Sequence, residues 1–160
     1  MKINKISIII PCFNEKETIL TLVDKVNNFN KIDTEIIIVD DFSIDGTREI
    51  LQNEIIKKYK NINLILHSKN KGKGAAIRTA LESVTGEVII IQDADLEYDP
   101  SEYDKLLKPI QLRKADVVYG SRFCGNEQRI HLFWHKVANN FLTLLCNIVT
   151  NLNLSDMETC

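Results

Sequence analysis

Short hydrophobic runs rich in β-branched residues alternate with helical patterns along most of this chain, and that alternation limits the fold more than any other feature. The runs occupy residues 6–10, 35–39, 62–66, 87–91 and 116–119. Each is almost continuously apolar, as strands are when both faces of a parallel sheet are covered. We therefore predict five buried strands.

Helical patterns fill the segments between and after these runs. They cover residues 15–29, 47–59, 74–84, 101–114 and 130–150. Asp45-Gly46-Thr47 precedes the second pattern as a start signal, and Pro109 is expected to end or kink the fourth. Strands and helices that alternate in this way predict an α/β fold with a mainly parallel sheet and right-handed crossovers.

Composition narrows the class of protein. The chain has 160 residues, 44% hydrophobic and 26% charged, which is enough to bury the core of one domain. A net charge of −2 argues against a nucleic-acid binder. No apolar stretch approaches the roughly 18 residues of a membrane span. The four cysteines are isolated, as suits a reducing cytoplasm.

Acidic residues gather where the predicted strands end. Asp40 and Asp41 follow the second strand, and Asp93, Asp95 and Glu97 follow the fourth. The carboxyl ends of parallel strands share one edge of a sheet, and such a cluster repels itself unless a cation or hydrogen-bond donors compensate it. We predict Mg²⁺ or Mn²⁺ there, because these ions take oxygen ligands and leave positions open for phosphates. Taken singly, each Asp has the alternative of capping a helix or turning the chain.

Two common nucleotide-binding motifs do not occur. The first strand leads into P-C-F-N-E rather than G-x-G-x-x-G, and Lys71-Gly72-Lys73-Gly74 does not match a Walker A loop. Two interpretations of the second segment stay open: backbone amides that bind an anion at a helix start, or a tight turn with two solvated lysines. A signalling receiver domain is disfavoured, because its acidic pair follows the first strand rather than the second.

The histidines and the tryptophan receive no catalytic role from the sequence. None of His67, His131 and His135 pairs with a cysteine at zinc-ligand spacing, and although His131 and His135 are four apart on a predicted helix, no third ligand is apparent, so we assign them no metal. Trp134 has two interpretations, packing in a core or contact with a bilayer surface.

Six segments, in this order, resemble the motifs of the family 2 inverting glycosyltransferases. They are IIIPCFNEKETI, IIIVDDFSIDGT, NKGKGAAIRTAL, IIQDADLEYDP, VYGSRF and NLSDMET, and together they span nearly the whole chain. The similarity is greatest to the branch that contains dolichol-phosphate mannosyltransferases and bacterial polyprenyl-phosphate glycosyltransferases. It implies a GT-A fold, a Rossmann-like three-layer α/β/α sandwich that binds a nucleotide-diphospho-sugar.

The resemblance also implies roles for single residues. Those expected to bind the nucleotide sugar are Pro11, Phe13, Glu15, Val39, Asp41, Lys73, Asp93 and Ala94. In the D-x-D-x-E segment, Asp95 and Glu97 are expected to hold the divalent metal. Arg122 corresponds to the residue that receives an acceptor phosphate. Arg129 is either a second contact to that phosphate or a solvated loop arginine.

The chemistry of sugar transfer agrees with these roles. Displacing a nucleoside diphosphate builds negative charge on the leaving phosphate, which a metal at Asp95 stabilises as a Lewis acid. A lipid phosphate is already anionic, so it needs positioning, and a bidentate Arg122 suits that task. Asp156 is a third expected catalytic residue. It is either a base for hydroxyl acceptors or an orienting group for a phosphate.

The combined hypothesis is a metal-dependent inverting transferase that moves a hexose from a UDP- or GDP-sugar to a polyprenyl or dolichyl phosphate. It acts in cell-envelope glycan synthesis, with the full-length protein peripheral at the cytoplasmic membrane face. Alternatives are transfer to a saccharide hydroxyl and a nucleotide-sugar-binding module without turnover. Residues 1–160 are expected to form one catalytic domain, with a donor half at 1–100 and the start of an acceptor half at 101–160. We expect more chain beyond Cys160, because the family motif continues past Asp156.

Overall fold

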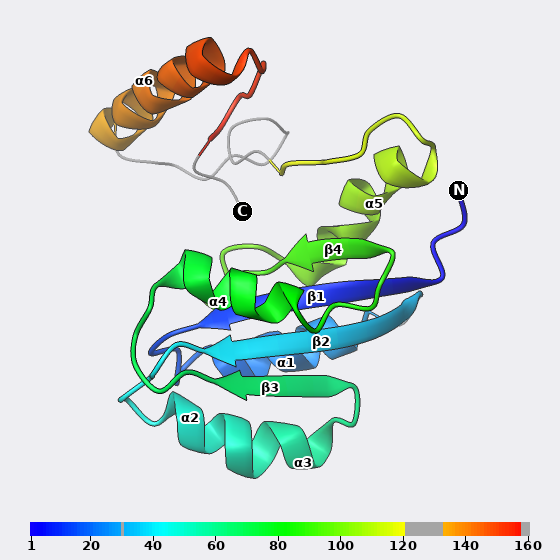
Figure 1. Cartoon of the computed structure of the whole chain (residues 1–160), viewed down its shortest axis with the longest axis vertical. Helices are drawn as coiled ribbons and strands as arrows, with labels where there is room; N and C mark the ends of the chain where they lie inside the picture. Colours follow the sequence, from blue (N-terminus) through cyan, green and yellow to red (C-terminus); the bar gives the residue numbers. More distant parts are fainter. Residues whose placement is uncertain (30, 121–132, 158–160) are drawn as a thin grey trace. The chain divides into compact units, whose positions relative to one another are not determined.

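The computed structural model describes residues 1–29, 31–120 and 133–157 (Figure 1). It divides into two compact units, Met1–Lys114 and Ala115–Cys160. The first unit extends beyond the expected donor half at 1–100. The reason is that η2 (Pro100–Glu102) and α5 (Tyr103–Gln111) add Tyr103 and Leu107 to its hydrophobic core.

A parallel sheet organises the first unit. Its strands are β1 (Lys5–Cys12), β2 (Asp33–Asp40), β3 (Ile62–Leu66) and β4 (Val88–Ile91), in the order β3-β2-β1-β4. In the central pair, Ile8 lies opposite Ile36 and Ile10 opposite Ile38. The first four predicted strands are therefore confirmed, and all their carboxyl ends point to the same edge of the sheet (Figure 1).

Helices cover both faces of this sheet. One face packs against α1 (Ile19–Asn27), α5 and a continuous helical segment made of α2 (Thr47–Ile50), the π-helical η1 (Leu51–Ile55) and α3 (Ile56–Lys58). The other face packs against α4 (Lys73–Leu81). Figure 1 shows α1 and α4 on opposite sides of the strands. The three layers agree with the predicted sandwich.

Side-chain alternation along the strands explains the two layers. Ile8 and Ile10 of β1 point into the core with α1, whereas Ile9 points toward α4. There the helix presents Ala76 and Ala80, both fully buried. Small side chains let α4 lie close to the sheet, so the start of this helix comes near the carboxyl edge.

The expected fifth strand is absent from the described residues. Residues 116–119 pair with no strand there, and Val117 and Tyr119 are 65% and 57% exposed. Hydrophobicity alone does not make a strand, which also needs a hydrogen-bonded neighbour. The fourth predicted helix ends at Gln111, two residues after Pro109, where Arg113 turns left-handed with a φ of 55°.

The second unit is built around α6 (Phe133–Thr150). This helix buries polar residues: Asn139 donates to Asp156 at 3.0 Å, and the hydroxyl of Thr143 accepts from the Met157 backbone at 3.1 Å. Apolar residues such as Phe141 and Ile148 are 59% and 68% exposed. Among the described residues, no helix has the length and apolar character needed to cross a membrane.

A polar network ties β1, β2 and β4 together at the amino ends of the strands. Glu35 accepts hydrogen bonds from Lys5, Ser7 and the Thr85 backbone and hydroxyl. Gly86 belongs here because a Cβ would lie 2.6 Å from the Ser7 nitrogen. Burial by itself would raise the pKa of Glu35, but these hydrogen bonds outweigh it and lower the pKa from 4.5 to about 2.

The network predicts an acid-sensitive contribution to stability. Because the folded-state pKa of Glu35 is depressed, its contribution is complete above pH 4.5 and is lost as the pH falls toward 2. The loss amounts to roughly 3 kcal/mol, at about 1.4 kcal/mol per pKa unit. Urea unfolding at several pH values should show this decline in the wild type and a flatter profile in Glu35→Gln. Glu54→Gln, on the exposed side of η1, is the control and should follow the wild type. Identical profiles for Glu35→Gln and the wild type would contradict the assignment.

Candidate active site

Loops from the carboxyl ends of all four strands surround a cavity of about 290 Å³. The lining residues come from the last two positions of β1, from the segments that follow the four strands and from α4. They are Pro11, Cys12, Phe13, Glu15, Asp41, Asn70, Gly72, Lys73, Ala76, Asp93, Ala94 and Asp95. The cavity therefore lies where ligands bind in parallel α/β sheets.

Most residues that the sequence assigned to the nucleotide sugar lie together in this cavity. Pro11, Phe13 and Glu15 line it from the β1 loop, and Phe13 is 45% exposed, so its ring is open to a ligand. Asp41, Lys73, Asp93 and Ala94 complete this predicted group. The sequence did not single out Asn70 as a lining residue, although Asn70 directly precedes the Lys71-Gly72-Lys73-Gly74 segment that was considered for anion binding.

Val39 was also expected to bind the nucleotide sugar. Its side chain is fully buried and packs in the core beneath α4, in the same cluster as Ala76, so it does not line the cavity. Strand alternation explains this, because Val39 lies between paired strands and has α4 above it. Its contribution to the site is packing support for a helix that does line the cavity.

Left-handed backbone turns occur in every loop that forms the cavity. Asn14, Phe42 and Leu96 have φ values of 56°, 68° and 65°, and Gly72 has 85°. For a bulky residue such as Phe42 this conformation is unfavourable, and strain of this kind collects at functional sites. The loops hold one another in place: the Asn14 side chain accepts from the Ile44 backbone at 2.9 Å, and its backbone donates to Ser43 at 2.9 Å.

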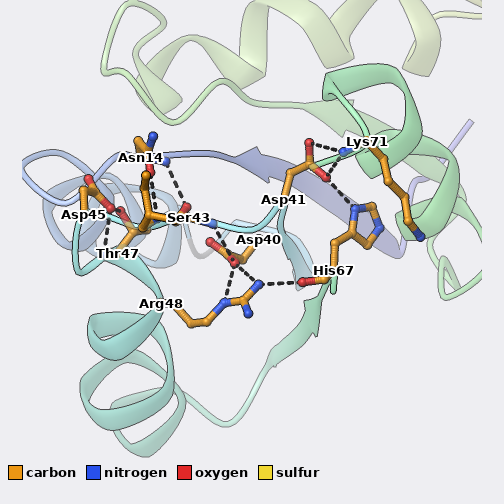
Figure 2. A network of polar contacts seen from close by, with 10 residues as sticks. Asn14, Asp40, Asp41, Ser43, Asp45, Thr47, Arg48, His67 and Lys71 are labelled. Atoms are coloured by element: carbon orange, nitrogen blue, oxygen red, sulfur yellow. Dashed lines mark hydrogen bonds and ion pairs between the residues drawn. The ribbon is translucent and has the colours of Figure 1, made fainter. Parts of the chain in front are cut away.

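Asp41 is held by three neighbours on the α4 side of the sheet (Figure 2). Its Oδ1 lies 2.6 Å from His67 Nδ1, and its two oxygens also accept from the Lys71 and Gly72 backbones. Burial would raise the pKa of Asp41, but these hydrogen bonds lower it below the usual value. Asp41 is therefore ionised at neutral pH, and protein hydrogen bonds stabilise its charge without a bound metal ion.

Asp40 is compensated on the opposite side of the sheet. Its carboxylate is fully buried, and Oδ2 lies 2.6 Å from Arg48 Nη2 and 2.8 Å from Nε. Arg48 also donates to the carbonyl of His67 at 2.7 Å, as Figure 2 shows. Within the described part of the chain Asp40 Oδ1 has no hydrogen-bond partner, so Arg48 carries most of the compensation.

The metal site that the sequence predicted for the whole acidic cluster is therefore restricted to the segment after β4 that carries Asp95 and Glu97. No group of three or more metal-ligating side chains lies together among residues 1–29, 31–120 and 133–157. The sequence allowed either a cation or hydrogen-bond donors to compensate this cluster, and for the carboxylates of Asp40 and Asp41 the structure provides protein donors. Mg²⁺ and Mn²⁺ commonly use one or two carboxylates plus substrate phosphates and water, so a smaller site suffices.

Asp95 and Glu97 fit such a smaller site. Both are exposed, and the left-handed Leu96 between them lets the Glu97 backbone donate to Asp95 Oδ1 at 3.0 Å. Asp95 lines the cavity, whereas Glu97 is not among its lining residues. Two exposed carboxylates two residues apart offer the hard oxygen donors that a hard divalent cation prefers.

The charge of the cavity is negative. Four carboxylates line it, and Lys73 is the one basic residue among its described lining residues. Lys73 Nζ lies 2.6 Å from Asp93 Oδ1, so its charge is shared with an acidic neighbour. An anionic ligand therefore needs further positive charge to enter.

Cys12 also lines the cavity, yet it is a poor nucleophile. Burial, and then the charge of Asp40, raise the pKa of its thiol, so the thiolate is not formed at neutral pH.

Three further residues were expected on the acceptor side. Arg122 and Arg129 fall outside the described residues. Asp156 belongs to the second unit, where it is 3% exposed and accepts from Asn139. That contact fixes one Asp156 oxygen against α6.

Comparison with known proteins agrees with this architecture. The model of the family described as Glycosyl transferase family 2 matches residues 7–159. The chain belongs to this family. The resemblance drawn from the six motifs is therefore confirmed.

Two curated relatives are informative. The dolichol-phosphate mannosyltransferase of Pyrococcus furiosus is 35% identical over 120 residues, which cover 74% of this chain and 33% of the relative. The undecaprenyl-phosphate 4-deoxy-4-formamido-L-arabinose transferase of Yersinia enterocolitica is 31% identical over 158 residues, 97% of this chain and 47% of the relative. The chain thus spans a third to a half of the relatives' length.

Solved structures support the fold. S. aureus TarS 1-349 in complex with UDP-GlcNAc has a TM-score of 0.62 at 25% identity and covers 80% of this chain and 37% of its own. The mannosyltransferase PcManGT from Pyrobaculum calidifontis, in complex with GDP-Man and Mn²⁺, has a TM-score of 0.58 at 25% identity, with 71% and 33% covered. The predicted GT-A fold is confirmed.

The buried Asp40–Arg48 pair should dominate the stability of this edge. Arg48→Met is expected to lower the free energy of unfolding by about 3–5 kcal/mol, because a carboxylate stays buried without its counter-charge. Adding Asp40→Asn in the same chain should restore part of that loss. Urea unfolding of the two variants tests the pair, and a loss below about 1 kcal/mol in Arg48→Met, as for exposed ion pairs, would refute it.

Proposed function

We propose that this enzyme transfers a hexose from a UDP- or GDP-sugar to a polyprenyl phosphate, with inversion and with a divalent metal. One observation carries the donor side: an acidic cavity at the carboxyl edge of the sheet, where Lys73 is the one basic residue among the described lining residues and where the exposed Asp95 belongs to the lining. The names of the two curated relatives support the acceptor, because both proteins are named for transfer to or on a polyprenyl phosphate.

The donor is proposed to lie along the cavity from the β1 loop to the start of α4. Pro11, Phe13 and Glu15 contact the nucleoside together with Asp41, since an aromatic face and carboxylates suit a base and a ribose. Lys73 contacts the diphosphate. To do so, its ammonium group gives up part of the ion pair with Asp93 and binds a phosphate oxygen in its place. Asp93 and Ala94 then lie beside the ribose and the sugar.

Electrostatics support metal-dependent donor binding. A diphosphate brings at least two negative charges into a cavity that already holds four carboxylates against one lysine, so a cation is required to offset the repulsion. Asp95 and Glu97 are proposed to hold Mg²⁺ or Mn²⁺, which when bound stabilises the leaving diphosphate as a Lewis acid. The Mn²⁺ in the PcManGT structure agrees with this choice.

The acceptor side is proposed to involve Arg122, with Arg129 as a second contact to the lipid phosphate. A guanidinium binds a phosphate through two hydrogen bonds, which orients an acceptor that is already anionic. Asp156 either orients the acceptor or serves as a base. Residues 1–100 form the donor half and 101–160 begin the acceptor half. A lipid acceptor is best met at the cytoplasmic membrane face, so we propose that the whole protein acts there.

Metal removal and substitution at Asp95 should have the same effect. Isothermal titration calorimetry with UDP and with GDP is expected to show binding of one nucleotide in Mn²⁺, and at least tenfold weaker binding in EDTA, a change of about 1.4 kcal/mol. Asp95→Asn in Mn²⁺ should behave like the wild type in EDTA. Asp33→Asn, at the amino end of β2, is the matched control and should bind normally. Full Mn²⁺-dependent binding by Asp95→Asn would remove this residue from the metal site.

A transfer assay tests the acceptor. The enzyme is incubated with a labelled UDP- or GDP-hexose and a short polyprenyl phosphate, and an organic-extractable labelled product is expected. Arg122→Ala should lose this product while calorimetry shows unchanged nucleotide binding. In a parallel incubation with an added oligosaccharide, labelling of the oligosaccharide with no extractable lipid product would favour transfer to a hydroxyl, and donor binding without turnover would indicate a binding module.

A further inference from the structure

His67 contacts several elements at the carboxyl edge of the sheet, although no functional role has been assigned to it so far. It follows β3 directly and is 4% exposed. Its backbone nitrogen donates to the Asp40 carbonyl at 2.9 Å, and its own carbonyl accepts from Arg48 at 2.7 Å. Its ring lies between Asp41 at 2.6 Å and the Thr79 hydroxyl of α4 at 3.0 Å. One residue thus joins β2, α2, β3 and α4.

The hydrogen-bond partners of the His67 ring determine how the ring is oriented and that Nδ1 carries a proton. The ionised Asp41 can only accept, so His67 Nδ1 carries a proton and donates. Nε2 lies 3.0 Å from the Thr79 hydroxyl, which can donate to a neutral ring or accept from a protonated one, so this contact forms in either state. The ring is therefore held at both ends, and it holds the Asp41 carboxylate in one orientation.

That orientation matters for the wall of the cavity. Asp41 Oδ2 accepts from the Lys71 nitrogen at 3.1 Å and from the Gly72 nitrogen at 2.7 Å. Gly72 has a φ of 85°, and both Gly72 and the next residue, Lys73, line the cavity. A rotated Asp41 carboxylate would release the backbone that turns into α4 and carries the Lys73 side chain.

We propose that His67 is a positioning residue for donor binding. By fixing the Asp41 carboxylate it holds the Gly72 turn and Lys73 toward the diphosphate, although its own ring does not line the cavity. This inference rests on the proposed function, in which the cavity binds the nucleotide sugar. The proposed role depends on one ring nitrogen, Nδ1, because Nδ1 contacts Asp41 whereas Nε2 contacts Thr79.

Two substitutions separate the two nitrogens. The amide nitrogen of His67→Asn can take the place of Nδ1 and donate to Asp41, whereas the longer His67→Gln brings its amide to the place of Nε2 and toward Thr79. Both variants lose one of the two contacts, so a purely structural role predicts similar losses in melting temperature and in affinity. A positioning role predicts that donor affinity follows the Asp41 contact.

The experiment measures the Kd of UDP and GDP in Mn²⁺ by calorimetry, with thermal unfolding of each variant alongside. For the nucleotide that the wild type binds, His67→Gln should bind about tenfold more weakly, while His67→Asn stays within about threefold, a separation of roughly 0.7 kcal/mol. Equal affinities for the two variants, at equal melting temperatures, would overturn the inference. A wild type that binds neither nucleotide would instead refute the proposed function.

A milder variant keeps the test decisive if His67→Gln does not fold. Thr79→Val removes the hydroxyl that contacts Nε2 and leaves the Asp41 contact in place. It should weaken nucleotide binding by about threefold, because the ring is then held at one end only, and leave cooperative unfolding intact. A loss of nucleotide affinity of tenfold or more in Thr79→Val, which keeps the Asp41 contact, would also overturn the inference.

Discussion

Two adjacent carboxylates buried at the end of β2 set the conditions for the whole carboxyl edge of the sheet. Asp40 is fully buried and Asp41 is 2% exposed. Because neighbours on a strand point to opposite faces, each needs its own compensation, and a buried charge left alone would cost several kcal/mol. Arg48 supplies it on one face, and His67 with the Lys71 and Gly72 amides supplies it on the other. The starts of α2 and α4 are thereby tied to the same strand.

This internal compensation decides which charges are left for a ligand. Asp40 and Asp41 are satisfied by the protein, so the remaining acidity of the cavity comes from the β1 and β4 loops. Lys73 offsets part of it through Asp93, and Asp95 and Glu97 stay exposed. An anionic diphosphate and a divalent cation enter such a cavity more favourably together than apart, since each reduces the repulsion that the other would meet. The donor and the metal are therefore expected to bind as one unit.

Sequence patterns predicted the positions of helices and strands better than they predicted which strands pair and which side chains pack together. Four strands formed where apolar β-branched runs were found, because both faces of the sheet are covered. The run at 116–119 is equally apolar but has no paired strand among the described residues, and pairing is not encoded locally. The period of α6 predicted a helix, yet its buried side carries Asn139 and Thr143, because Asp156 and Met157 bring polar partners to them. Val39 belonged to the right motif but faces the core.

The order of strands and helices, the parallel sheet and the gathering of motif residues at its carboxyl edge follow from the amino-acid sequence. Hydrophobic periodicity and the order of the elements can be read directly from the sequence. The family motifs additionally indicate which residues belong to the site. Folding in three dimensions was needed to decide which carboxylates the protein neutralises and which it leaves exposed. Charge compensation depends on distances of 2.6 Å between groups such as Asp41 and His67, which are 26 residues apart. Such a contact has no signal in either residue's neighbourhood, and for that reason His67 became visible only in the folded chain.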